Sequence, residues 1–134
     1  MKRLIKWMRK SEKGQAMVEM ALVLPILLIL LGGIIDFGWL FYNQLALTNA
    51  AREGARYAAI HHHNSPDWEE KTISLMNGTY IGAARAEASV YEPQESQICA
   101  TMTADVPILT GVASTILGDD SMTLTGTCIM RLEN

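Results

Sequence analysis

The sequence lacks the short motifs that mark common enzyme active sites. It has no glycine-rich phosphate loop, no HExxH zinc-binding pair and no Gly-x-Ser-x-Gly nucleophile elbow. Three histidines occur together at 61–63, but adjacent side chains at a helix end point in different directions, and no cysteine or second histidine cluster completes a metal site. We therefore expect no catalytic residues, no metal and no cofactor, and we interpret the histidines as a solvated helix end.

Basic residues are scarce over most of the chain. After Ile35, five basic residues stand against twelve acidic ones, so a nucleic-acid-binding surface is not expected. Before Glu19 the balance is reversed, with Glu12 set against six basic residues: Lys2, Arg3, Lys6, Arg9, Lys10 and Lys13. Because this basic cluster precedes an apolar span, the positive-inside rule places the N-terminus in the cytoplasm and the C-terminal part outside it.

The apolar span runs from Gln15 to Ile35, 21 residues interrupted only by Glu19 and Pro25. As a helix it would be about 31 Å long, enough to cross the hydrocarbon core of a bilayer. A secretory signal peptide is the alternative, but its apolar region is shorter and ends in a small-x-small cleavage site. No Ala-x-Ala follows this span, so we expect it to be retained as a single-pass anchor.

Glycines at 32, 33 and 38 lie near the outer end of this span. They would let a neighbouring helix approach closely, or they simply reflect the frequent use of glycine in membrane helices. The sequence leaves both explanations open.

The helical pattern continues beyond the span. Residues 43–60 contain no proline and many alanines, and Ala51, Ala55 and Ala59 recur every four residues on one face. The simplest interpretation is one helix over about residues 15–60, on the order of 65–70 Å long. We expect its exposed alanine stripe to pack against a helix of another subunit.

Residues 61–134 are expected to form a small α+β domain. Asp67 is a candidate N-cap for a helix that begins at Trp68. Residues 98–106 and 122–130 alternate between apolar and polar side chains, which predicts two antiparallel strands separated by residues 107–121.

Cys99 and Cys128 are the two cysteines, one on each expected strand. In an oxidising compartment outside the cytoplasm we expect them to form a disulfide, worth roughly 3–4 kcal/mol in the chain-entropy description. The alternative is two free buried thiols.

Glu19 is the most unusual residue of the apolar span. A carboxylate at the edge of the hydrocarbon is costly and is a functional hypothesis by default. Cleavage after Gly14 would create an α-amino group on Gln15, and this amine is a candidate partner for Glu19.

Three segments, 13–25, 36–38 and 49–59, resemble the TadE-like proteins of the tight-adherence (Flp, type IVb) pilus system. The resemblance implies a pilin-like pseudopilin or minor pilin in the cytoplasmic membrane of a bacterium, with a basic prepilin-type leader at residues 1–14. It implies that a prepilin peptidase cleaves after Gly14, that Gln15 becomes the N-terminus and that Glu19 is the acidic fifth position. The implied partners are the major pilin, a sister pseudopilin and the inner-membrane assembly platform. Met20 and Gln15 depart from the aromatic and apolar residues usual at these positions in major pilins.

Two other classes remain as alternatives. One is a single-pass anchored binding module unrelated to pili, which has no use for Glu19 or for an alanine stripe outside the membrane. The other is a membrane-tethered enzyme, for which the sequence offers no candidate residues.

Overall fold

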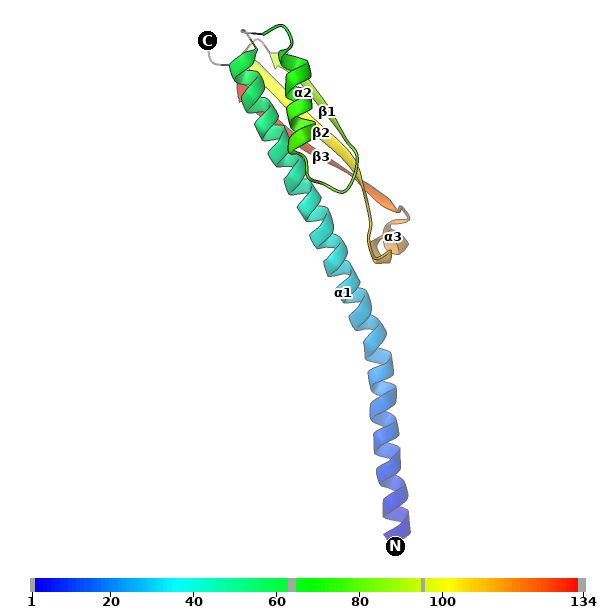
Figure 1. Cartoon of the computed structure of the whole chain (residues 1–134). Helices are drawn as coiled ribbons and strands as arrows, with labels where there is room; N and C mark the ends of the chain where they lie inside the picture. The colour runs from blue at the N-terminus through cyan, green and yellow to red at the C-terminus, as the bar shows by residue number, and fades with distance from the viewer. Residues whose placement is uncertain (1, 63–64, 95, 133–134) are drawn as a thin grey trace.

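The long helix α1, Lys2–His61, dominates the molecule. The computed structural model describes residues 2–62, 65–94 and 96–132, with the side chains of α1 described from Gly14 onward. The N-terminal half of α1 projects away from a small domain that packs along its C-terminal half (Figure 1). The long helix expected over residues 15–60 is confirmed, and it begins earlier, so the basic segment and the apolar span form one continuous helix.

The small domain has two layers. A three-stranded antiparallel sheet in the order β1-β2-β3 is formed by Ala86–Gln94, Gln97–Pro107 and Ser121–Arg131. The C-terminal half of α1 and the helix α2, Trp68–Thr79, cover one face of this sheet (Figure 1). The predicted α+β class and the antiparallel pair of strands near the C-terminus are therefore confirmed.

Strand β1 was not predicted. Its inward side chains are small, because Ala86 and Ala88 alternate with exposed Glu87 and Ser89, so the apolar alternation in the sequence is weak. The strand lies at the edge of the sheet, where Pro93 near its end is tolerated because that position need not donate a ladder hydrogen bond.

Small residues bring α1 very close to the sheet. A Cβ added to Gly126 of β3 would lie 2.6 Å from the backbone of Leu47 and Thr48 in α1. The core between the layers is built mostly from alanine and methionine side chains: Leu47, Ala50, Ala51, Ala55, Met76, Ala100, Met102, Ala104 and Val106. Alanine has little volume, so the helix and the sheet pack at close distance.

Helix α2 begins directly after Asp67, as predicted, although the Asp67 side chain makes no capping hydrogen bond. It continues past Asn77 and Gly78 to Thr79, and it buries Met76 against Gly54 of α1.

The connection between β2 and β3 contains the short helix α3, Val112–Leu117. Gly111 and Gly118 flank it with φ values of 71° and 83°, a left-handed conformation that glycine adopts without steric cost. The connection extends beyond the sheet towards the N-terminal half of α1 (Figure 1).

Candidate membrane and assembly site

The N-terminal half of α1 exposes an almost continuous apolar surface. Among the described residues, α1 is the only helix long and apolar enough to cross a membrane, and its most apolar stretch is almost entirely uncovered by the rest of the described chain. The exposed apolar side chains are Met17, Val18, Met20, Leu22, Val23, Leu24, Ile26, Leu27, Leu28, Ile29, Leu30, Leu31, Ile34 and Ile35. Since so large an apolar surface is unfavourable in water, α1 has the properties of a single-pass membrane anchor.

Gly14, Gln15 and Glu19 lie at the start of this surface and are exposed. The Gln15 Nε2 amide donates a hydrogen bond of 3.2 Å to the Glu19 carboxylate, one helical turn along α1. A Cβ on Gly14 would meet nothing within 4 Å. The backbone around Gly14 and the Glu19 carboxylate are thus accessible to another molecule.

A polar and aromatic collar, formed by Asp36, Trp39 and Tyr42, follows the apolar surface along α1. Asp36 is 2 % exposed, and its carboxylate accepts hydrogen bonds from the Thr110 backbone amide at 2.8 Å and the Thr110 hydroxyl at 2.6 Å. The Trp39 indole donates to the Pro107 carbonyl at 3.1 Å, and the Tyr42 hydroxyl donates to the Ile81 carbonyl at 3.3 Å. These contacts join α1 to two loops of the small domain.

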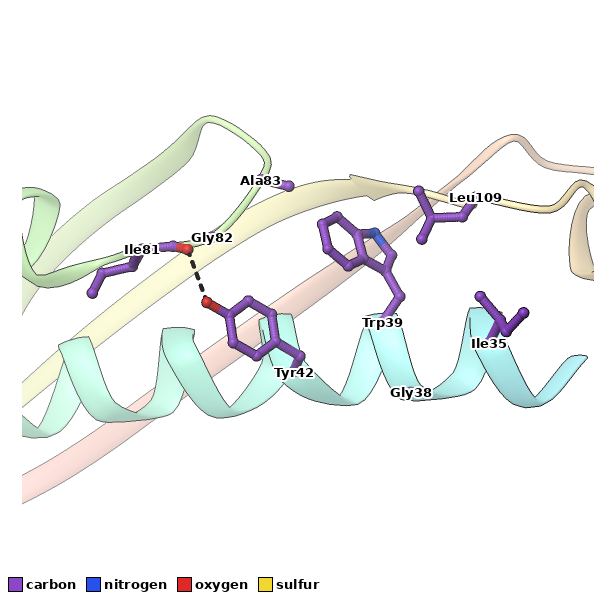
Figure 2. Close-up of a pocket in the computed structure, with 8 residues that line it drawn as sticks. All are labelled: Ile35, Gly38, Trp39, Tyr42, Ile81, Gly82, Ala83 and Leu109. Atoms are coloured by element: carbon purple, nitrogen blue, oxygen red, sulfur yellow. Dashed lines mark hydrogen bonds between the residues drawn. The ribbon is translucent and has the colours of Figure 1, made fainter. Parts of the chain in front are cut away.

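An apolar groove of about 540 Å³ lies along this collar. Figure 2 shows the Trp39 and Tyr42 rings standing on α1 between the 81–83 loop and Leu109, with Ile35 at the end nearest the membrane span. The groove is open to solvent and offers mainly carbon atoms. It is suited to apolar contacts.

Asn43 is a buried residue that the sequence analysis did not single out. Its side-chain nitrogen donates to the Trp39 carbonyl at 2.9 Å, and its oxygen accepts from the Tyr80 hydroxyl at 3.3 Å and the Ala83 amide at 3.2 Å. Burial raises the pKa of Tyr80 above its ordinary value of 10.0, because the charged phenolate is poorly solvated there. The sequence feature that could have identified Asn43 is an amide side chain among mainly apolar residues on one face of the helix.

The alanine stripe faces the protein's own domain. Ala51 and Ala55 are fully buried in the core between α1 and the sheet, and Ala59 is half-buried. The expectation that these side chains form an exposed surface for another subunit is wrong for Ala51 and Ala55. The residues left exposed on this part of α1 include Arg52 and Arg56, and Arg56 pairs with Glu53 at 3.2 Å.

The expected disulfide is absent, since both Cys99 and Cys128 are free. In the register of the sheet, Cys99 is opposite Ile129 and Cys128 is opposite Ala100, an offset of one residue. Successive side chains of a strand point to opposite faces, so Cys128 faces α1 while Cys99 lies on the outer face with Tyr91. A disulfide across the sheet would require a shift of the backbone. A hydrogen bond with Cys99 raises the pKa of the Tyr91 hydroxyl.

Two of the three histidines, His61 and His62, lie at the C-terminal end of α1. The His61 ring stacks on Tyr57, and His62 pairs with Glu92 and contacts the edge of Trp68. His63 lies outside the described residues. Within the described part of the chain, no three His, Cys, Asp or Glu side chains form a group that could hold a metal.

Part of the chain matches a known protein family. The family model of the TadE-like protein matches residues 14–56, which begin at Gly14 and include the apolar span and part of the core-forming segment of α1. No curated protein and no solved structure matches the chain. The resemblance recognised in the sequence is confirmed over these residues.

Proposed function

From its TadE-like segment, we propose that the protein is a pseudopilin or minor pilin that takes part in assembly of a tight-adherence (Flp-type) pilus. Its α1 helix anchors it in the bacterial cytoplasmic membrane, with the basic end in the cytoplasm and the small domain outside. Its partners are the major pilin, a sister pseudopilin and the inner-membrane assembly platform. A prepilin peptidase processes it.

The observation that carries this proposal is the position of Glu19. The carboxylate lies on the apolar surface of α1 that the chain's own domain leaves uncovered. A charge at the centre of a membrane helix costs roughly 2.5–3.5 kcal/mol on insertion scales, and somewhat less near the interface. A protein that needed only an anchor would be expected to avoid this cost.

Cleavage after Gly14 supplies the missing positive charge. The Gln15 side chain already contacts Glu19 at 3.2 Å, so the new α-amino group on Gln15 would start one helical turn from the carboxylate. An ion pair at this depth can offset the desolvation of both charges if its geometry is good. The same carboxylate can pair with the amine of a neighbouring subunit, and this would fix the stagger between the two helices.

The first experiment tests processing. The intact mass of the full-length chain, extracted from membranes of a cell that has the peptidase, should correspond to a chain beginning at Gln15. Gly14→Leu should leave the heavier, uncleaved form. Gly33→Leu is the matched control, because a side chain at position 33 also meets nothing within 4 Å but lies far from the cleavage site. An uncleaved wild-type chain would exclude its own α-amine as the partner of Glu19.

The second experiment tests association. Glu19→Gln should insert into the membrane at least as well as the wild type but should cross-link less to other pilus subunits. Glu53→Gln is the control, because it removes an acidic side chain on the same helix outside the span. If Glu19→Gln assembles as well as the wild type, Glu19 serves only recognition by the peptidase. If the wild type is neither cleaved nor associated with pilus subunits, the anchored binding module is the better description.

A further inference from the structure

The connection between β2 and β3 reaches the level of the membrane span. Asp36, which Thr110 contacts, follows directly after the last residue of the span, Ile35. Gly32 lies three residues before Ile35, about 4–5 Å deeper into the span along the helix axis. A Cβ on Gly32 would lie 2.7 Å from Val112 Cγ2, so the start of α3 packs directly on a turn of α1 that belongs to the span.

We propose that this connection, residues 107–118, inserts into the leaflet of the bilayer on the side of the small domain and forms a second membrane contact beside α1. The proposal rests on the membrane-spanning role given to α1 above. The partner of this segment is the lipid of that leaflet, in the region where headgroups meet acyl chains.

The composition of the segment supports lipid as the occupant. Residues 107–118 contain no charged side chain, and Asp119 and Asp120 follow directly, exposed, where the chain returns to β3. Leu109 is 54 % exposed and lies at the end of the groove near Ile35, which is exposed to the same extent (Figure 2). The apolar surface of the tip is therefore continuous with that of the span.

The three hydroxyl groups of the segment, on Thr110, Ser114 and Thr115, have partners within the protein. The Thr110 amide and hydroxyl donate to Asp36, and the Ser114 and Thr115 hydroxyls donate to the Gly111 carbonyl at 3.0 and 2.7 Å. Satisfied polar groups lower the cost of leaving water. The Trp39 indole bonded to the Pro107 carbonyl lies just above this level, a position typical of tryptophan at a membrane interface.

Charge argues against binding through anionic headgroups. The part of the chain after Ile35 has an excess of acidic residues, and two of them adjoin the tip. Insertion should therefore be driven by apolar contact and should occur in vesicles of neutral phosphatidylcholine.

Spin-label accessibility in such vesicles tests the proposal with three matched positions. In a Cys99→Ala, Cys128→Ala background of the full-length chain, labels are placed by Leu109→Cys, Leu27→Cys and Tyr91→Cys. The wild-type side chains are 54 %, 53 % and 52 % exposed, so they differ in location and not in exposure. Collisions with oxygen report lipid, and collisions with a water-soluble nickel chelate report water.

The ratio of oxygen to nickel collisions at position 109 should be several-fold higher than at 91 and should approach the ratio at 27. A ratio at 109 equal to that at 91, with 27 in lipid, overturns the insertion and leaves the anchor intact. A label at 27 that is open to water overturns the membrane-spanning role and this proposal with it. Low collision rates with both reagents at 109 mean that a second copy of the chain covers the tip, and this too overturns the proposal.

The wild-type chain provides a measurement that needs no substitution. Phosphatidylcholine carrying a photoreactive group near the start of its acyl chain should form adducts on the 108–117 segment as well as on α1. Adducts on α1 without any on the 108–117 segment contradict the proposal. Strand β1, on the far edge of the sheet, is the internal control and should remain unmodified.

Discussion

Asp36 and Thr110, 74 residues apart in the chain, form two hydrogen bonds at the point where the membrane span meets the small domain. The Asp36 carboxylate is buried there, so its solvation by water has been replaced by these donors. This pair connects the tip of the β2–β3 connection to α1.

Thr110→Val should destabilise the small domain. It keeps the shape of the side chain but removes the 2.6 Å hydroxyl donor to a buried carboxylate, which is worth about 1–3 kcal/mol. Thermal unfolding of the sheet, followed by circular dichroism of the full chain in nanodiscs, should show a lower Tm. Thr125→Val is the control: its hydroxyl bonds to Thr103 on the exposed face of the sheet, so a loss as large as that of Thr110→Val would argue against a special role for Asp36.

Gly126→Ala should destabilise the contact between β3 and α1. The new methyl group would lie 2.6 Å from helix backbone atoms that cannot rotate away, and overpacking of this kind costs typically about 1–3 kcal/mol. Gly78→Ala in α2 is the matched control, because it meets nothing within 4 Å and should leave the Tm unchanged or raise it. Equal Tm values for the two variants would show that α1 and β3 are farther apart in solution than in this structure.

Cys99 and Cys128 should both be free in the mature protein. Denaturation without reductant, in the presence of an alkylating reagent, should add two alkyl groups to each chain, because the two thiols face opposite sides of the sheet. The same count after reduction is the control. If the chain takes up alkyl groups only after reduction, the disulfide expected from the sequence is present and this prediction is wrong.

Tyr80→Phe should make the stability of the small domain decrease less steeply as the pH rises above 10.0. The pKa of Tyr80 is raised in the folded state, so the folded protein holds this proton more tightly than the unfolded chain does. The resulting stability is fully present below the ordinary value of 10.0 and is lost as pH rises through the folded pKa. The slope of Tm against pH above 10.0 should therefore be steeper in the wild type than in Tyr80→Phe, and identical slopes would contradict a raised pKa of the partly buried phenol.

Periodicity and composition were sufficient for much of the fold. The apolar span predicted the anchoring helix, and strict alternation around Met102 and around Leu124 predicted β2 and β3. These predictions succeed because burial of one strand face or helix face imposes a period on the sequence itself. Strand β1 was missed because alanines on its inner face leave only a weak period.

The sequence alone determined which residues share a face, where the membrane span lies and which residue within it carries a charge. Only the tertiary structure decided what each face meets. Ala51 and Ala55 of the alanine stripe meet the chain's own sheet because Gly126 lets β3 approach α1. The two cysteines are separated by a one-residue register offset that no spacing in the sequence reveals. Asp36 meets Thr110 because the β2–β3 connection reaches back along α1. Such contacts depend on strand register and on how the sheet is docked on the helix, and both are set by packing between segments distant in the chain.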